Sequence, residues 1–184
     1  MHDPERREVI KAMPIMAMAG LGSASSAAPA APTVPPLEFA FRLQVLIAPP
    51  QDMGLVDGIR RRMIPITGGT VEGPRLAGRV LPGGGDWQGI GPDGIARIEA
   101  RYTIEAADGS LIGVTNPGMR HGPPQVIADI AAGKDVDPAL YYFRTTPRFD
   151  VAADSRHGWM ARTIFLCSAA RYRDHVRLDV FSVA

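Results

Sequence analysis

Residues 95–105 read IARIEARYTIE, a stretch in which apolar and polar side chains alternate. One face carries Ala96, Ile98, Ala100, Tyr102 and Ile104, and the other carries Arg97, Glu99, Arg101, Thr103 and Glu105. A period of two is that of a β-strand, because successive side chains of a strand point to opposite faces of the sheet. The stretch therefore predicts a strand that places one face against an apolar core.

The same alternation occurs in residues 37–47 and 175–183, and shorter β-type runs lie at residues 63–66, 76–81, 111–115, 140–145 and 163–168. They are separated by turn signals, which include Gly68-Gly69, Gly83-Gly84-Gly85, Asp93-Gly94 and Asp108-Gly109. No helices alternate with these strands, so the pattern predicts an all-β fold that closes antiparallel strands into a barrel or a sandwich.

One segment has the spacing of a helix instead. Residues 123–132 begin with two prolines and are followed by Gly133, and both residue types are tolerated at these positions of a helix. We expect this short helix to pack across one opening of the β-structure as a lid or plug.

The first thirty residues have the features of an export signal. Arg6-Arg7 precedes a short apolar run at residues 12–21, and small residues follow at 23–30. This order is typical of a twin-arginine signal. We therefore expect a signal at residues 1–30, an Ala/Pro-rich linker at 31–36 and one domain at 37–184, located in the periplasm or secreted. If residues 1–30 are instead a disordered tail, the protein is cytoplasmic.

Charge and cysteine content exclude several classes of protein. The chain has a formal net charge of +1, and its densest basic run, Arg60-Arg61-Arg62, reads as the rim of a strand. Nucleic-acid binding and attachment to an anionic membrane both need clustered cations, so we expect neither partner. The single cysteine, Cys167, excludes an internal disulfide and lies in an apolar run, which predicts a buried thiol and not a nucleophile.

The chain lacks the motifs of the common hydrolases and metalloenzymes. It has no Gly-x-Ser-x-Gly elbow, no His-Glu-x-x-His pair and no phosphate-binding loop. His121, His157 and His175 are not spaced as metal ligands. We therefore expect neither a metal nor a cofactor.

Several motifs together resemble one known family, domain of unknown function 3237, also called uncharacterised protein family 0311. They are ITGGTVEGP at 66–74, VLPGGGDW at 80–87, NPGMRHGP at 116–123 and YYFRTTPRF at 141–149, within a match from about residue 37 to 183. The resemblance implies a closed antiparallel β-barrel of lipocalin-like proportions, often found as a homo-oligomer, with no activity common to the family. The chain departs from the family pattern at residues 149–151 and 159–161 and at Glu99, so the activity of one member is not carried over.

The matching motifs supply candidate site residues. Catalytic candidates are Glu72, Asp86, Arg101 and His121, and substrate-binding candidates are Glu99, Tyr142 and Arg144. Arginine binds a carboxylate or enolate in a bidentate manner, and a desolvated carboxyl group acts as an acid or base near neutral pH. These residues predict a small-molecule enzyme, a lyase, isomerase, cyclase or lactone hydrolase, that acts on a carbonyl- or carboxylate-bearing metabolite by proton transfer.

Simpler explanations exist for the same residues. The charged face of residues 95–105 is also what a solvated outer surface would carry. Glu72 could brace a turn, and Asp86 could cap the glycine turn while Trp87 closes one end of the barrel. The alternative function is a lipocalin-like carrier without turnover, and a third possibility is a barrel packed solid as a building block of an oligomer.

Overall fold

The computed structural model of the protein describes residues 32–184. The predicted export signal and the first linker residue lie outside the described residues. The elements, in chain order, are β1 (Leu37–Ile47), β2 (Gln51–Val56), β3 (Ile59–Glu72), β4 (Gly78–Val80), β5 (Gly84–Ile90), β6 (Ala96–Ala106), β7 (Leu111–His121), α1 (Pro124–Ala131), η1 (Pro138–Leu140), β8 (Tyr142–Thr145), β9 (Arg148–Asp150), η2 (Gly158–Arg162), β10 (Phe165–Arg171) and β11 (His175–Val183). No helix in this part of the chain has both the length and the apolar composition to span a membrane.

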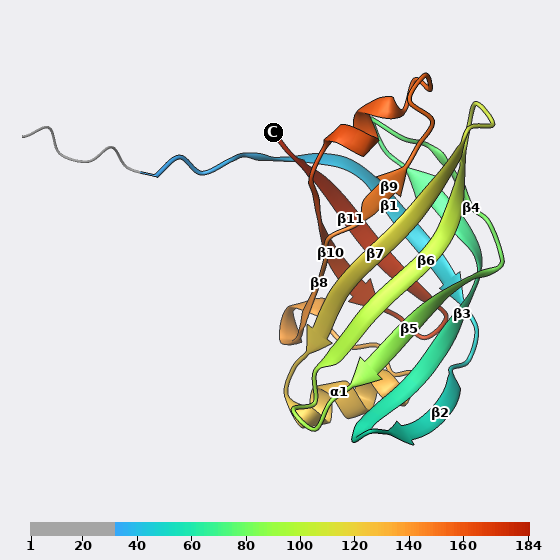
Figure 1. Ribbon diagram of the computed structural model, residues 1–184. Coiled ribbons are helices and arrows are strands. Elements are labelled where there is room, and N and C mark those ends of the chain that lie inside the picture. The colour runs from blue at the N-terminus through green and yellow to red at the C-terminus, as the bar shows by residue number, and fades with distance from the viewer. Residues whose placement is uncertain (1–31) are drawn as a thin grey trace, which may run out of the picture. The chain divides into compact units, whose positions relative to one another are not determined.

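Eight of these strands close into an antiparallel barrel, as Figure 1 shows. Around the ring, β1 pairs with β3, β3 with β5, β5 with β6, β6 with β7, β7 with β8, β8 with β10, β10 with β11, and β11 with β1. The predicted antiparallel β-barrel is confirmed. Closure leaves no free sheet edge in the ring, so the barrel itself needs no further strand for its backbone hydrogen bonds.

The remaining strands extend the ring. β4 lies between β3 and β6 beyond the end of β5, and β9 pairs with β7 beyond the end of β8. β2 forms a hairpin with β3 through Asp57-Gly58, and both turn residues have positive φ (50° and 77°). This is the geometry that an Asp-Gly hairpin turn favours.

The two ends of the barrel differ in what fills them. At the η2 end, Phe41, Phe149 and Phe165 meet edge to face, with ring centroids 5.0–5.9 Å apart, and Ile104 and Ile112 are buried. At the other end, α1 lies beneath the strand ends (Figure 1), and its Ile130 is buried. The interior at the η2 end is therefore an aromatic and aliphatic core.

Two local predictions are wrong. Gly68-Gly69, predicted as a turn, lies inside β3, because positive φ values of 143° and 149° bend the strand without ending it. The strand predicted at residues 111–115 is too short, because β7 continues through residues 116–121. His121 is therefore the last residue of a strand. The helix predicted at 123–132 is confirmed as α1.

Candidate functional site

Polar side chains gather inside the barrel at its α1 end, in what we call the inner polar cluster. Its members are Arg62 on β3, Asp86 and Gln88 on β5, Tyr102 on β6, Asn116 and Arg120 on β7, and Arg171 on β10. Strand register brings them together: Asp86 pairs with Ala100, which pairs with Asn116, and Gln88 pairs with Arg62. The cluster therefore draws on five strands, from β3 near the start of the barrel to β10 near its end.

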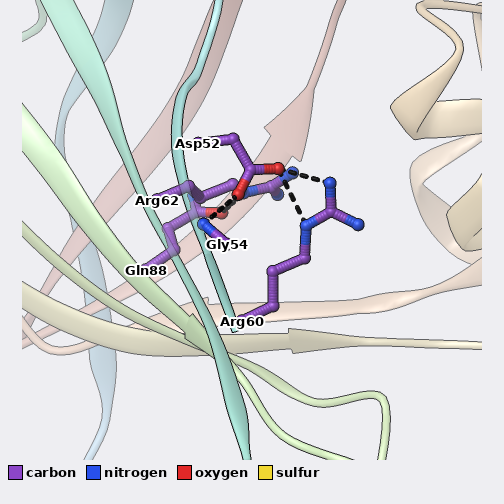
Figure 2. Close-up of polar contacts among 5 residues, drawn as sticks. All are labelled: Asp52, Gly54, Arg60, Arg62 and Gln88. Carbon is purple, nitrogen blue, oxygen red and sulfur yellow. Dashed lines mark hydrogen bonds and ion pairs between the residues drawn. The ribbon is translucent and has the colours of Figure 1, made fainter. Parts of the chain in front are cut away.

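A chain of two hydrogen bonds fixes the carboxyl group of Asp86. Arg62 Nε donates to Gln88 Oε1 at 2.8 Å, a contact that Figure 2 shows, and Gln88 Nε2 donates to Asp86 Oδ2 at 2.5 Å. Gln88 is 3% exposed, so both bonds are shielded from water. With Oδ2 held in this way, the second oxygen, Oδ1, is left available.

That second oxygen faces a small internal cavity. The cavity has a volume of about 40 Å³ and is lined by Asp86, Tyr102 and Asn116 together with apolar side chains such as Ile66 and Leu178. Four oxygens of the lining residues are buried without a hydrogen-bond partner among the described residues: Asp86 Oδ1, Tyr102 Oη, Asn116 Oδ1 and Thr145 Oγ1. Buried polar atoms are nearly always paired, so four unpaired oxygens around one space indicate a place for a polar guest.

Burial sets the protonation of this site. Desolvation raises the pKa of Asp86, and the Gln88 hydrogen bond and the charges of Arg120, Arg62 and Arg171 oppose that effect without cancelling it. Desolvation also raises the pKa of Tyr102, which keeps its hydroxyl group protonated. A carboxyl group with a raised pKa can both donate and accept a proton near neutral pH, which is what general acid/base catalysis requires.

The cluster opens toward α1 through a second pocket. This pocket has a volume of about 850 Å³ and is lined by Arg62, Arg120 and Arg171, by Ile64, and by the end of α1 from Ile130. Desolvation, together with the positive charges of Arg62 and Arg171, lowers the pKa of Arg120 to about 10. Arg62, Arg120 and Arg171 thus share one partly enclosed space, and the exposed Arg173 also lines it.

Most of the residues chosen from the sequence lie elsewhere. Of that set only Asp86 points into the barrel, and its neighbour Trp87 is 48% exposed on the outer face, so Trp87 does not close the barrel end. Glu99 and Arg101 are also on the outer face, where Arg101 Nη2 donates to Glu99 Oε1 at 2.6 Å. The expectation that Arg101 and Glu99 face the lumen is wrong, because β6 turns its apolar residues inward.

The other four candidates are also outside the lumen. His121 and Tyr142 stack with ring centroids 4.9 Å apart, and the Arg144 guanidinium lies 5.4 Å from the Tyr142 ring. Tyr142 is 43% exposed, so this group lies on the outer face of β7 and β8. Glu72 is exposed at the far end of β3, eight residues or roughly 26 Å from the position that pairs with Asp86. These residues cannot act together with Asp86 on one small molecule.

Sequence reasoning missed six members of the cluster, although strand parity marks several of them. Arg62 shares its face of β3 with the buried Ile64, and Arg171 shares its face of β10 with the buried Ala169. Arg120 stands directly before His121 in a motif that was singled out for the histidine. A charged residue in phase with buried neighbours is the signal that would have found them.

Other chemistry has less support in residues 32–184. No group of three or more His, Cys, Asp or Glu side chains there could hold a metal ion. Cys167 is 2% exposed, and burial raises its pKa to about 12, so the thiol stays protonated. This agrees with the buried, unreactive cysteine expected from the sequence.

Several known proteins are similar to this chain in sequence, and solved structures share its fold. A UPF0311 protein from Bradyrhizobium diazoefficiens is 45% identical over 123 residues, which cover 67% of this chain and 80% of the relative. The crystal structure of a protein of unknown function from Rhodopseudomonas palustris is 38% identical and superposes with a TM-score of 0.78, covering 82% of this chain and all of that one. The hydroalkoxylation enzyme phnH of Penicillium herquei is 35% identical over 81 residues, 44% of this chain and 54% of that protein.

One family model spans the barrel. The model described as protein of unknown function (DUF3237) matches residues 35–183, from just before β1 to the end of β11. This range includes every strand that contributes to the inner polar cluster. The chain belongs to the DUF3237 family, and its curated relatives from Bradyrhizobium diazoefficiens and Rhodopseudomonas palustris carry the name UPF0311.

Proposed function

We propose that the protein is a cofactor-independent enzyme that acts on a small carbonyl- or carboxylate-bearing molecule by acid/base chemistry at Asp86. The observation that carries this proposal is the buried, unpaired Oδ1 of Asp86, beside a cavity whose lining residues hold three further unpaired oxygens. A structural carboxylate would use both oxygens for hydrogen bonds. Asp86 accepts a hydrogen bond through Oδ2, which holds the carboxyl group in place, and its Oδ1 is free to contact a substrate.

Each neighbour has a role that its chemistry supports. Gln88 and Arg62 orient the carboxyl group, because their hydrogen bonds leave Oδ1 directed at the cavity. The Tyr102 hydroxyl is a neutral donor that can hold a carbonyl or enol oxygen of the substrate. In this arrangement Asp86 gives a proton to one substrate atom and takes one from another, with water or a substrate hydroxyl group as the nucleophile.

The relative from Penicillium herquei supports this reaction class. Hydroalkoxylation, the activity in its name, adds an O–H bond across a carbon–carbon double bond. Such an addition needs a proton delivered to carbon and a proton removed from oxygen, so acid/base groups are sufficient for it. Lyases, isomerases, cyclases and lactone hydrolases use the same proton transfers, and the proposal covers this set.

The experiment compares wild-type protein with Asp86→Asn and with Arg101→Gln, a matched control on the outer face. Each is incubated with a defined mixture of organic acids, lactones and phenols in D₂O, and mass spectrometry follows loss of substrate and incorporation of deuterium. We expect wild type and R101Q to transform the same compounds and D86N to be slower by about a hundredfold or more, the size of a lost acid/base group. Equal activity of D86N would contradict the role of Asp86.

A lipocalin-like carrier is the alternative that the same experiment addresses. The apolar wall of the small cavity, with Ile66 and Leu178, would suit a bound ligand without reaction. Compounds that are retained by the protein through gel filtration but never transformed would favour the carrier.

We further propose that the enzyme works outside the cytoplasm. Arg6-Arg7, the apolar run and the small residues after it support export by the twin-arginine route, which carries folded proteins. The family match begins at residue 35, after this segment. A shortened chain in the periplasmic fraction is the expected result, and a full-length chain confined to the cytoplasm contradicts it.

A further inference from the structure

Three arginines at the α1 end of the barrel lack an acidic partner. Arg62, Arg120 and Arg171 come from β3, β7 and β10 and line the same 850 Å³ pocket. Within residues 32–184 none of them forms an ion pair. Some surface arginines, such as Arg42 and Arg97, pair with an aspartate, and others do not. Among the described arginines without an ion pair, Arg62, Arg120 and Arg171 differ from the rest in being wholly or partly buried.

Burial makes that arrangement unfavourable without a ligand. Arg120 is 5% exposed, and its Nε is buried with no hydrogen-bond partner among the described residues. Desolvation is the largest influence on all three guanidinium groups, and Arg62 and Arg171 further destabilise the positive charge of Arg120. Asp86 is the acidic residue that acts on all three. The pocket lining as a whole carries Arg173 as a fourth arginine, together with Asp135 and Asp174, so positive charge stays in excess even when Asp86 is ionised. An excess of positive charge in a partly dry space favours an incoming counter-charge.

The geometry points to an organic oxyanion as the occupant: we propose that Arg62, Arg120 and Arg171 bind the carboxylate, or an equivalent planar enolate or phenolate, of a substrate whose apolar part lies against Ile47, Ile64 and Ile130. Guanidinium groups bind planar oxyanions through paired N–H donors. The three isoleucines supply an apolar wall beside them. A small volume with apolar walls and a few convergent charges is typical of a site for a small metabolite.

The rim of the pocket restricts the charge of the ligand. Asp135 and Asp174 also line it, together with Arg173, so the excess of positive charge over the whole lining is small and does not match a multiply charged group such as a phosphate ester. A singly charged acid is attracted by the arginines and is repelled less by the two aspartates. The inference deepens the proposed function, because it names the substrate class, and it depends on that function only for the claim that the bound acid is transformed.

Calorimetric titration of the folded protein with benzoate tests the binding site. Benzyl alcohol serves as the uncharged probe of similar size, and inorganic phosphate as the anion without an apolar part. We expect benzoate to bind at millimolar concentration or below, with benzyl alcohol and phosphate at least about tenfold weaker. Absence of benzoate binding, or equal binding of either comparison probe, overturns the proposal.

Substitutions locate the bound anion. Arg120→Met keeps an unbranched side chain and removes the guanidinium group with its charge, and Arg101→Met is the matched change on the outer face. R120M should weaken benzoate binding at least about tenfold and R101M should leave it unchanged. Arg171→Met provides the same test if R120M fails to fold, as judged by circular dichroism. Undiminished binding by both pocket variants overturns the proposal.

A further variant separates this inference from the proposed reaction. Asp86→Asn removes the one negative charge inside the cluster, so it should keep or strengthen benzoate binding while abolishing turnover. Loss of benzoate binding in R120M together with full turnover by D86N would refute the proposed reaction and leave the anion site intact. If wild type turns over substrate, D86N does not, and wild type fails to bind benzoate, the anion site is refuted and the proposed reaction stands.

Discussion

At the scale of single residues, strand parity decides which charged side chains can share a site. Asp86 and Trp87 are neighbours in sequence, yet Asp86 lines the internal cavity and Trp87 lies on the outer face. Arg101 follows the inward Ala100 and is exposed for the same reason. The alternation in residues 95–105 already predicts an outward Arg101, because the apolar face of a strand packs against the core. The family motifs drew attention to Arg101 against that rule.

The raised pKa of Asp86 makes a prediction about stability. The folded protein holds the Asp86 proton at pH values where the unfolded chain, with an ordinary aspartate pKa, has lost it. In that window the folded state binds more protons, so the free energy of unfolding falls as pH rises from the unfolded to the folded pKa. Asp86→Asn has no such loss, and its stability relative to wild type should increase with pH across the window.

Urea unfolding of both proteins between pH 3 and 8 measures this difference. Other aspartates, such as Asp52 and Asp93, have lowered pKa values because of arginine hydrogen bonds, and they destabilise both proteins alike as pH falls. Their contribution cancels in the comparison. A difference that is flat, or that decreases with pH, would mean that the folded protein does not disfavour the Asp86 carboxylate.

At the scale of elements, the alternation of side chains predicted most of the strands and turn residues predicted many of their ends. Two failures have a common cause, which is that Gly and Pro do not always end a strand. Gly68 and Gly69 bend β3 at positive φ. Pro117 lies in β7 where its neighbour changes from β8, which pairs from Gly118, to β9, which pairs from Thr115. A proline without an N–H group is tolerated at such a break in pairing.

The two glycines of β3 form a matched pair for a test of this bend. A Cβ at Gly69 would lie 2.1 Å from the backbone oxygen of Gln44 on β1, whereas at Gly68 the nearest atom, Val80 O, would be 3.6 Å away. Both have positive φ, so both alanine variants are strained, but only Gly69→Ala also forces β1 and β3 apart. We expect Gly68→Ala to cost about 1–3 kcal/mol of unfolding free energy and Gly69→Ala more than about 4.

Thermal or urea unfolding of the two alanine variants gives this comparison directly. Equal losses of unfolding free energy in the two variants would show that the close approach of β3 to β1 at Gly69 does not affect stability. The result bears on function as well, because β3 carries Arg62 at its other end.

At the scale of the whole molecule, the interior of the barrel is filled differently at its two ends. Phenylalanines fill the η2 end, and the inner polar cluster occupies the α1 end. No single stretch of sequence could reveal this division, since Arg62, Asp86, Arg120 and Arg171 meet only through the closure of the ring. The fold was predictable from local periodicity, but the site depends on register between distant strands. Assembly into a homo-oligomer stays a prediction.

The division explains why one fold can be both stable and reactive. The packed half supplies a core in which Phe41 and Phe165 are fully buried, and that core can compensate for the buried charges and unpaired oxygens near Asp86. The reactive half is then free to hold groups that a solid core would exclude. The central claim is that Asp86 sits in this half as a carboxyl group that binds its proton unusually tightly, beside arginines that receive an anion.

The most direct measurement is a ¹³C NMR titration of the Asp86 carboxyl carbon, assigned with D86N, in the presence and absence of benzoate. The account predicts that Asp86 titrates at higher pH than Asp52 and Asp93, and that benzoate moves its pKa further up because the bound anion offsets the charge of Arg62, Arg120 and Arg171. An Asp86 that titrates together with the surface aspartates and does not respond to benzoate would contradict it.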